Sequence, residues 1–405
     1  MDHAVSRLLA HERVRAARHH IERTDEVTLA RQTALSAIPA PTGAEGRRAA
    51  HVAELFGEIG LSDVTVDLIG NVHGWFRKNG EGSAPVVLAA HLDTVFGIEV
   101  DVAVERRGHR LEGPGISDNA RGLAALVAVA DAMVAARVPT ARPILFAATV
   151  GEEGSGDLRG VKYLLNGKHD VAPVAFIALD GAGLERVIHR ALGSKRYHVT
   201  FRGPGGHSWA AFGIANPANA VGRAAALLAD LPLPAPSANS ARPRTTCAVV
   251  RLGGGTGLNS IPQEAWLDLD LRSEDPHALA QLDVTVRAAL ERAADDENRR
   301  RTAGTPPLRL EIQLVGDRPS GITPRAHPLV QAAVAVNRAL GRDAELTSAS
   351  TDANVPIALG IPAIALGAGG KAGDAHLATE WYENIEGALG VVRALLVTAA
   401  MAEIR

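Results

Sequence analysis

Four short runs of apolar residues are the feature that most constrains how this chain can fold. They are VVLAAH at 86–91, PILFAAT at 143–149, VAFIAL at 174–179 and PAIAL at 362–366. A continuous apolar run of this length is typical of a strand that is buried on both faces of a parallel or mixed sheet. Between the runs lie patterns typical of helices, at 119–136, 158–166 and 327–341. This alternation predicts an α/β fold built on a layered mixed sheet.

Ahead of the first run, helical patterns occur at 2–22, 25–37 and 44–59, and strand patterns at 63–69 and 72–78. The pattern changes between residues 187 and 316. There we expect, in chain order, a strand, a helix, two strands, a helix and a strand at 189–202, 216–230, 245–253, 264–273, 276–300 and 307–315. This βαββαβ order predicts a small ferredoxin-like α+β domain. The larger α/β domain would then consist of 1–186 and 317–405.

Composition excludes several classes of protein. The 405 residues include 42 Lys and Arg and 45 Asp and Glu, a net charge of −3, and no long basic run that would follow a phosphate backbone. We therefore expect no nucleic-acid partner. The single cysteine, Cys247, excludes an intramolecular disulfide, so a metal site would have to be built from His, Asp and Glu.

The first twenty residues alternate charged and apolar side chains at helical spacing and lack the apolar core of a signal peptide. The longest uncharged stretch, 353–370, is interrupted by proline and glycine and is too short for a membrane span. We expect a cytoplasmic protein with no membrane partner.

Histidines and carboxylates follow the buried strands, at the edge where ligands bind in open α/β sheets. Each has an ordinary structural explanation when it is taken alone: a turn, a helix N-cap or a solvated loop charge. Together they form a set of hard N and O ligands: His91, Asp118, Glu153, Asp180 and His376. Converging carboxylates require a counter-charge, which a pair of divalent cations would supply.

The segments HLDT, GPGISDNARG, GEEGSGD, ALDGAG and GDAHLATE, in this order and spacing, resemble the M20 family of dinuclear zinc peptidases and deacylases. The resemblance covers nearly the whole chain. It includes PAPTGAEG near the N-terminus and the inserted domain, which in this family is a lid and dimerisation domain. Within the family the chain is most similar to the peptidase T-like exopeptidases, relatives of carboxypeptidase G and acetylornithine deacetylase.

The resemblance implies two divalent metal ions, with zinc as the first choice and cobalt or manganese compatible with the same ligands. Asp118 would bridge both ions. Glu153 and His376 would bind one ion, and His91 and Asp180 the other. The peptide bond after Asp118 is often cis in this family.

Three further residues take catalytic roles by the same resemblance. Asp93 would orient His91, and Glu152 would be the general base. His207, in FRGPGGHSW, corresponds to a histidine that reaches the metal site of the partner subunit in family dimers and stabilises the oxyanion. The resemblance therefore implies a homodimer that forms through the lid domain.

Substrate contacts are less specific in the sequence. Asn259 and Arg272 lie in LNSIPQEAWLDLDLR, which resembles the substrate-facing segment of the lid, and are candidates for holding a substrate carboxylate. Arg272 could instead pair with a neighbour on its strand. The glycines Gly367, Gly369 and Gly370 would let backbone amides approach the substrate, or would simply permit a tight loop.

The function predicted from these residues is metal-dependent hydrolysis of amide bonds in short peptides, with an aminopeptidase acting on di- or tripeptides as the leading interpretation. An N-acyl amino acid deacylase or a carboxypeptidase of the same family is the alternative, because the motifs of the metal site are shared. A metal- or peptide-binding protein without activity is a third possibility, and the presence of Glu152 argues against it.

Overall fold

The computed structural model describes residues 1–77, 83–166, 172–233 and 244–404. The chain forms two compact units, the first made of Met1–Ala191 and Ile322–Arg405 and the second of Leu192–Gly321. The boundaries proposed above, at 186/187 and 316/317, lie a few residues earlier. The first boundary moves because β8 (Arg186–Ala191) pairs with strands of the first unit. The second moves because β14 (Arg309–Arg318) pairs with the second unit up to Arg318.

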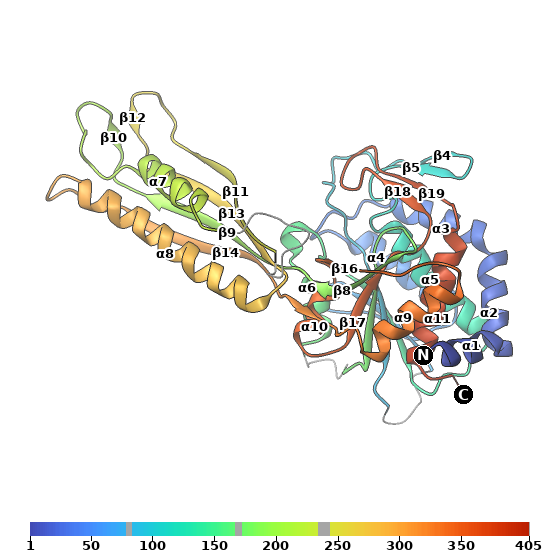
Figure 1. Ribbon diagram of the computed structural model, residues 1–405. Helices are drawn as coiled ribbons and strands as arrows, with labels where there is room; N and C mark the ends of the chain where they lie inside the picture. The colour runs from blue at the N-terminus through green and yellow to red at the C-terminus, as the bar shows by residue number, and fades with distance from the viewer. Residues whose placement is uncertain (78–82, 167–171, 234–243, 405) are drawn as a thin grey trace. The chain divides into compact units, whose positions relative to one another are not determined.

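The first unit is built on one large mixed sheet, which confirms the predicted α/β class (Figure 1). Its strands lie in the order β1 (Ser62–Val66), β2 (Val72–Phe76), β6 (Ile144–Thr149), β3 (Val86–His91), β7 (Ala175–Leu179), β17 (Ala363–Leu366), β8 and β15 (Gly321–Ile322), and β16 (Glu345–Ala349) pairs with β8. Strand β3 is parallel to both β6 and β7, and β17 is parallel to β7. The carboxyl ends of these four strands therefore lie along one edge of the sheet.

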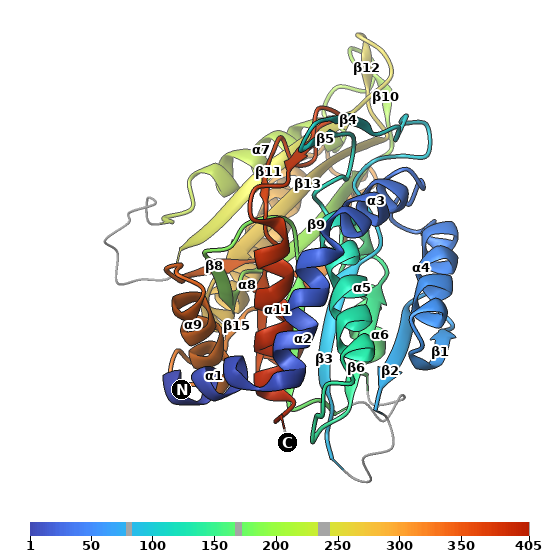
Figure 2. The same ribbon diagram turned by 90° about the vertical axis from the view of Figure 1, so that its right-hand side faces the viewer.

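Helices cover both faces of this sheet. They are α1 (Asp2–Ala10), α2 (Glu12–Arg23), α3 (Asp25–Ser36), α4 (Gly46–Glu58), α5 (Ala120–Ala135), α6 (Arg159–Leu164), α9 (Pro328–Ala339), α10 (Asn354–Ala358) and α11 (Gly387–Met401), with a 3-10 turn at Gly154–Gly156. Val86, Leu88 and Ala90 of β3 pack with α2, α5 and α11, which lie together in Figure 2. Val87 and Ala89 face the opposite way, toward α6 and α10. The strand is thus buried on both faces, as its apolar run predicts.

Two segments that the sequence predicts as single elements are each two elements in the structure, so these two predictions are wrong. The helix expected at 2–22 is two helices, α1 and α2, because the chain turns at His11, whose Nδ1 accepts a hydrogen bond from the amide of Arg13 and caps α2. The strand expected at 189–202 is also two strands, β8 and β9 (Gly193–Arg202), which belong to different units.

A small sheet lies beside the large one in the first unit and was not predicted. It consists of β18 (Lys371–Gly373), β19 (Trp381–Glu383), β5 (Arg110–Glu112) and β4 (Glu105–Arg107). Strands of three residues are too short to display a period of two, so sequence patterns cannot reveal them.

The second unit is a four-stranded antiparallel sheet with two helices on one face. Its strands lie in the order β11 (Thr245–Gly254), β13 (Glu264–Ser273), β9 and β14 (Arg309–Arg318), and its helices are α7 (Pro217–Ala229) and α8 (Pro276–Arg300). Tyr197, Val199 and Phe201 of β9 pack with both helices. A short pair of strands, β10 (Gly206–His207) and β12 (Ser260–Ile261), extends from this sheet.

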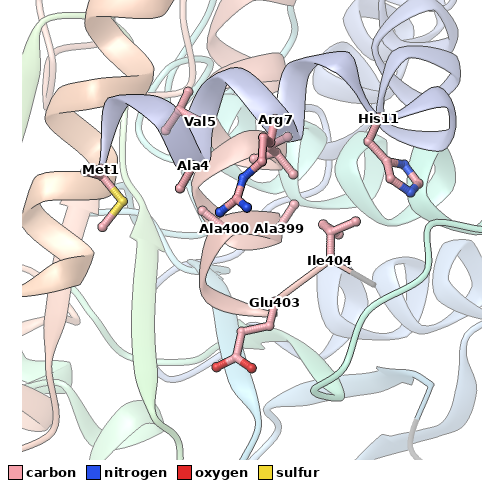
Figure 3. Close-up of a pocket in the computed structure, with 10 residues that line it drawn as sticks. Met1, Ala4, Val5, Arg7, His11, Ala399, Ala400, Glu403 and Ile404 are labelled. Carbon is pink, nitrogen blue, oxygen red and sulfur yellow. The ribbon is translucent and has the colours of Figure 1, made fainter.

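Figure 3 shows a pocket of about 440 Å³ between α1 and the end of α11. Val5, Arg7, His11 and Glu403 are among the residues that line it, and none of the predicted site residues is. Across the described part of the chain, no helix combines the length and the hydrophobicity that crossing a membrane requires.

Candidate metal centre

The predicted site residues of the first unit meet at the carboxyl edge of the large sheet. His91 is the last residue of β3, and its partner in the sheet is Thr149, the last residue of β6. Glu152 and Glu153 follow β6 in the chain, and Asp180 follows β7. Because β3, β6 and β7 are parallel, the sheet itself brings these side chains together.

His91 has the hydrogen-bond geometry of a metal ligand. Its Nδ1 lies 3.0 Å from the carbonyl oxygen of Asp93, which can only accept, so Nδ1 carries a proton. Its Nε2 lies 3.0 Å from Oδ1 of Asp118 and 3.8 Å from Oδ1 of Asp180. In the neutral ring this nitrogen presents a lone pair to carboxylate oxygens, and the contact is favourable only with a cation between them. The site therefore fits a metal ion, whose place a proton takes in its absence.

His376, like His91, places its Nε2 close to two carboxylate oxygens, one of which belongs to Asp118. Its Nε2 lies 3.2 Å from Oδ2 of Asp118 and 3.2 Å from Oε1 of Glu153. The two oxygens of Asp118 thus face two different histidines. Ligand atoms of His91, Asp118 and Glu153 lie within 4.8 Å of one another. Neutral imidazole and carboxylate ligands in this arrangement suit zinc, cobalt or manganese, and they could hold two ions.

Asp118 lies just before α5, but it does not cap that helix. The N-cap is Asn119, whose Oδ1 accepts a hydrogen bond from the amide of Gly122. The carboxylate of Asp118 is therefore directed to the histidines, and the peptide bond between Asp118 and Asn119 is cis.

Asp93 is fully buried below this cluster and supports it. Its Oδ1 accepts a hydrogen bond of 2.9 Å from the amide of Glu152, and its Oδ2 accepts one of 2.9 Å from the amide of Glu153. The hydroxyl of Thr42 donates to Oδ2 at 2.8 Å. Burial opposes ionisation, but His91, the amide of Glu153 and the hydroxyl of Thr42 lower the pKa of Asp93 to about 2. A charged Asp93 thus fixes the backbone that carries both glutamates.

The carboxylates and the histidines of the cluster shift one another's pKa values. Burial opposes the protonation of His91, but hydrogen bonds with Asp118, Asp180 and Asp93 raise its pKa well above the ordinary value. Hydrogen bonds with Asp118 and Glu153 raise the pKa of His376 to about 10. Burial also opposes the ionisation of Asp118, and the two histidines nevertheless lower its pKa. Without metal, both histidine rings therefore carry a second proton, and with it a positive charge, at neutral pH.

Three supporting residues escaped sequence analysis: Thr42, Arg48 and Glu380. The guanidinium of Arg48 is fully buried and donates to the carbonyl oxygens of Leu92 at 2.8 Å and Ile38 at 2.7 Å. Glu380 accepts hydrogen bonds from backbone amides that include that of Asp118. Thr42 and Glu380 stand in two segments that carried the family resemblance, PAPTGAEG and GDAHLATE, which was the only signal available.

His207, Asn259 and Arg272 lie in the second unit. His207 is exposed, and its Nδ1 accepts from the amides of Trp209 at 3.2 Å and Ala210 at 3.4 Å, so the proton of the neutral ring is on Nε2. Asn259 lies next to it, because its carbonyl oxygen accepts from the amide of Ser208 at 2.9 Å.

Two candidates for substrate binding have partners within the protein. Nε of Arg272 donates to Oδ2 of Asp270 at 2.9 Å, which is the pairing with a strand neighbour that the sequence left open. Gly369, in the first unit, has φ +80°, and its amide donates to the carbonyl oxygen of Gly183 at 3.0 Å. A Cβ at Gly369 would lie 2.6 Å from the carbonyl oxygen of Gly387 at the start of α11. This geometry favours the tight-loop explanation for Gly369.

Comparisons with known proteins are consistent with this geometry. The sequence model of peptidase family M20/M25/M40 matches residues 87–402. No curated protein matches the sequence. The structure is similar to that of aminopeptidase PepT from Bacillus cereus, with 20% identity, a TM-score of 0.72, and coverage of 93% of this chain and 98% of that chain.

Two other solved structures share the fold at low sequence identity. The dipeptidase Dug1p from Saccharomyces cerevisiae is 15% identical with a TM-score of 0.73, over 96% of this chain and 98% of that chain. An amidase of the hydantoinase/carbamoylase family from Burkholderia vietnamiensis is 18% identical with a TM-score of 0.65, over 94% of this chain and 96% of that chain.

Metal binding to the metal-free protein should release about two protons at pH 7, because the raised pKa values keep His91 and His376 protonated there. Calorimetry with zinc in two buffers of different ionisation enthalpy measures this number. Affinity should increase with pH as these protons are lost. His376→Ala should release about one proton fewer, and His51→Ala, on the surface of α4, should behave like the wild type. A wild type that releases no protons would contradict the assignment.

Proposed function

This chain belongs to peptidase family M20/M25/M40 and is a hydrolase, and we propose that it removes the amino-terminal residue from di- and tripeptides in a metal-dependent reaction. The observation that carries this proposal is the position of Asp118, whose two carboxylate oxygens face two histidines at 3.0 and 3.2 Å. Glu152 follows the neighbouring strand, and it is nearly fully buried.

The proposed metal centre has two cations. His91 and Asp180 would hold one, Glu153 and His376 would hold the other, and Asp118 would bind both. Such a pair of ions supplies Lewis-acid polarisation of the scissile carbonyl and makes the attacking water more acidic. The histidine and carboxylate ligands support zinc first, with cobalt or manganese as alternatives.

Glu152 is the proposed general base. Its carboxylate would take a proton from the attacking water and deliver it to the nitrogen of the leaving amine. Its backbone amide is fixed by Asp93 at 2.9 Å, in the same way as that of Glu153. Two adjacent residues are thereby held so that one carboxylate would bind a cation and the other would transfer the proton.

We assign oxyanion stabilisation to His207 of the partner subunit in a homodimer that forms through the second unit. The support is twofold. Nε2 carries the proton of the neutral His207 ring and can donate to a developing negative charge. Trp209, Phe212 and Leu258, close to His207 and Asn259 in the chain, expose large apolar side chains, which is typical of an interaction surface.

The proposed substrate class follows the names of two structures with this fold, an aminopeptidase and a dipeptidase. The amidase among the similar structures supports the alternative, an N-acyl amino acid deacylase or a carboxypeptidase, because its name describes an enzyme of this fold that acts on another kind of amide. Asn259 and Arg272 are the proposed contacts for a substrate carboxylate, and for Arg272 this requires exchanging its pairing with Asp270.

The zinc- or cobalt-loaded protein should remove the first residue from a free tripeptide and leave the N-acetylated tripeptide intact. Mass spectrometry of the products identifies the bond that is cut. Release of acetate or of the carboxy-terminal residue would replace the aminopeptidase assignment with the deacylase or carboxypeptidase alternative. If neither peptide is cleaved, N-acyl amino acids with longer acyl groups are the next substrates to assay.

Glu152→Ala should lower kcat by about 10²- to 10⁴-fold, the usual contribution of a general base, and should leave metal stoichiometry unchanged. Steady-state kinetics and metal analysis of the same preparation measure both quantities. Glu345→Ala is the matched control, because Glu345 is an exposed carboxylate on β16. An active Glu152→Ala protein would remove this residue from the role of base.

Mixing His207→Ala with Glu152→Ala protein should restore part of the activity that each variant lacks. In a mixed dimer, one site would combine an intact metal centre and Glu152 with an intact His207 from the other subunit. Activity is measured after the mixture has been incubated long enough for subunits to exchange. Absence of recovery, with exchange demonstrated by mass labelling, would mean that each site uses its own His207 or none.

A further inference from the structure

Glu380 is a fully buried carboxylate whose hydrogen bonds all go to the loop that carries Asp118. Its Oε1 accepts from the amides of Ser117 and Asp118, each at 2.8 Å. Its Oε2 accepts from the amide of Gly115 at 3.1 Å. Hydrogen bonds to an ionised acceptor are about twice as strong as neutral ones. One side chain thus organises three peptide groups of a single loop.

Other polar groups of this loop also have hydrogen-bond partners. The carbonyl oxygen of Pro114 accepts from Oγ of Ser36 at 3.0 Å, and that of Ile116 accepts from Nε2 of Gln32 at 2.8 Å. Both donors lie on α3. The amide of Gly113 donates to the carbonyl oxygen of Glu380 at 2.8 Å. The loop is therefore held by α3 through its carbonyl groups and by Glu380 through its amides.

Glu380 also belongs to the segment that carries His376. The amide of Glu380 donates to the carbonyl oxygen of Leu377 at 3.0 Å, and that of Leu377 donates to the carbonyl oxygen of Asp374 at 2.9 Å, so these residues form a compact turn. The contact between Glu380 and Asp118 joins residues that are 262 positions apart in the chain. A single carboxylate thus connects the segments of two residues that face each other at 3.2 Å, His376 and Asp118.

We propose that Glu380 is a positioning residue that sets the carboxylate of Asp118 between His91 and His376, a role that rests on the proposed metal centre. Glu380 does not bind the ions or the substrate. It acts through the backbone of Asp118, by fixing the peptide group on the amino side of that residue. Loss of a group that orients a metal ligand commonly lowers metal affinity or activity by about 10- to 100-fold.

The alternative is that Glu380 only stabilises the fold, as any buried and hydrogen-bonded carboxylate does. The second unit offers a matched control in Glu297, which is also buried. It accepts from the amide of Asn216 at 3.0 Å and pairs with Arg223 at 3.3 Å. Substitution of either glutamate should lower thermal stability, but only substitution of Glu380 should change how the protein binds metal.

The experiment compares full-length metal-free wild type, Glu380→Gln, Glu380→Ala and Glu297→Gln during titration with Co²⁺. Calorimetry gives the affinity and the number of ions, and visible absorption reports the ligand geometry around cobalt. We expect two ions in the wild type and in Glu297→Gln, with the same spectrum. We expect affinity reduced by about 10-fold or more, together with a changed spectrum, in the Glu380 variants.

Folded Glu380 variants that bind two cobalt ions with wild-type affinity and spectrum would overturn this role, even if their thermal stability falls. If Glu380→Ala does not fold, Glu380→Gln decides the question, because glutamine keeps the volume and one carbonyl acceptor. A wild type that binds fewer than two ions would overturn the proposed centre itself, and the role of Glu380 with it. None of these measurements uses a substrate, so they are independent of the identity of the peptide.

Discussion

The crowding of carboxylates around two histidines is the constraint on which the rest of this structure depends. Asp118 lies within 3.2 Å of both His91 and His376, and Asp180 and Glu153 approach the same two rings. Carboxylates this close repel one another unless positive charge lies between them. In the metal-free protein, protons on the histidines provide this charge, which is the reason that the pKa of His376 rises to about 10. The same demand makes the cluster suited to divalent cations.

Hydrogen bonds between buried charged side chains and backbone peptide groups hold the loops that carry the cluster. Asp93 accepts hydrogen bonds from the amides of Glu152 and Glu153, and Glu380 accepts one from the amide of Asp118. Arg48 donates to the carbonyl oxygen of Leu92, between His91 and Asp93. Burial lowers the pKa of Arg48 to about 10, and the charge of Asp93 opposes this effect. A fixed backbone suits this purpose because a peptide group that is bonded on both sides cannot relax away from a ligand. The side chains of the candidate metal centre therefore stand on loops whose backbone is held by buried hydrogen bonds.

The proposed chemistry and the proposed recognition of substrate are assigned to different units. The first unit contains the cluster and Glu152, and the second contains His207, Asn259 and Arg272. Similar structures with identities of only 15–20% keep this fold although their names describe peptidases and an amidase. The fold therefore tolerates extensive change of sequence, and a shared fold does not fix which bond is cleaved.

The sequence by itself determined the four buried strands, their place in a layered mixed sheet, and the types of ligand that follow them, because these features are local patterns of two to eight residues. It also placed Glu152 beside Glu153 at a strand end. Only the tertiary structure decided which oxygen of Asp118 faces which histidine, that Arg272 pairs with Asp270, and that Glu380 holds the loop before Asp118. The division of the strand expected at 189–202 between two sheets was decided in the same way. Each of these outcomes depends on the partner that a residue meets in the folded chain, and a partner up to 262 positions away leaves no mark on the local pattern.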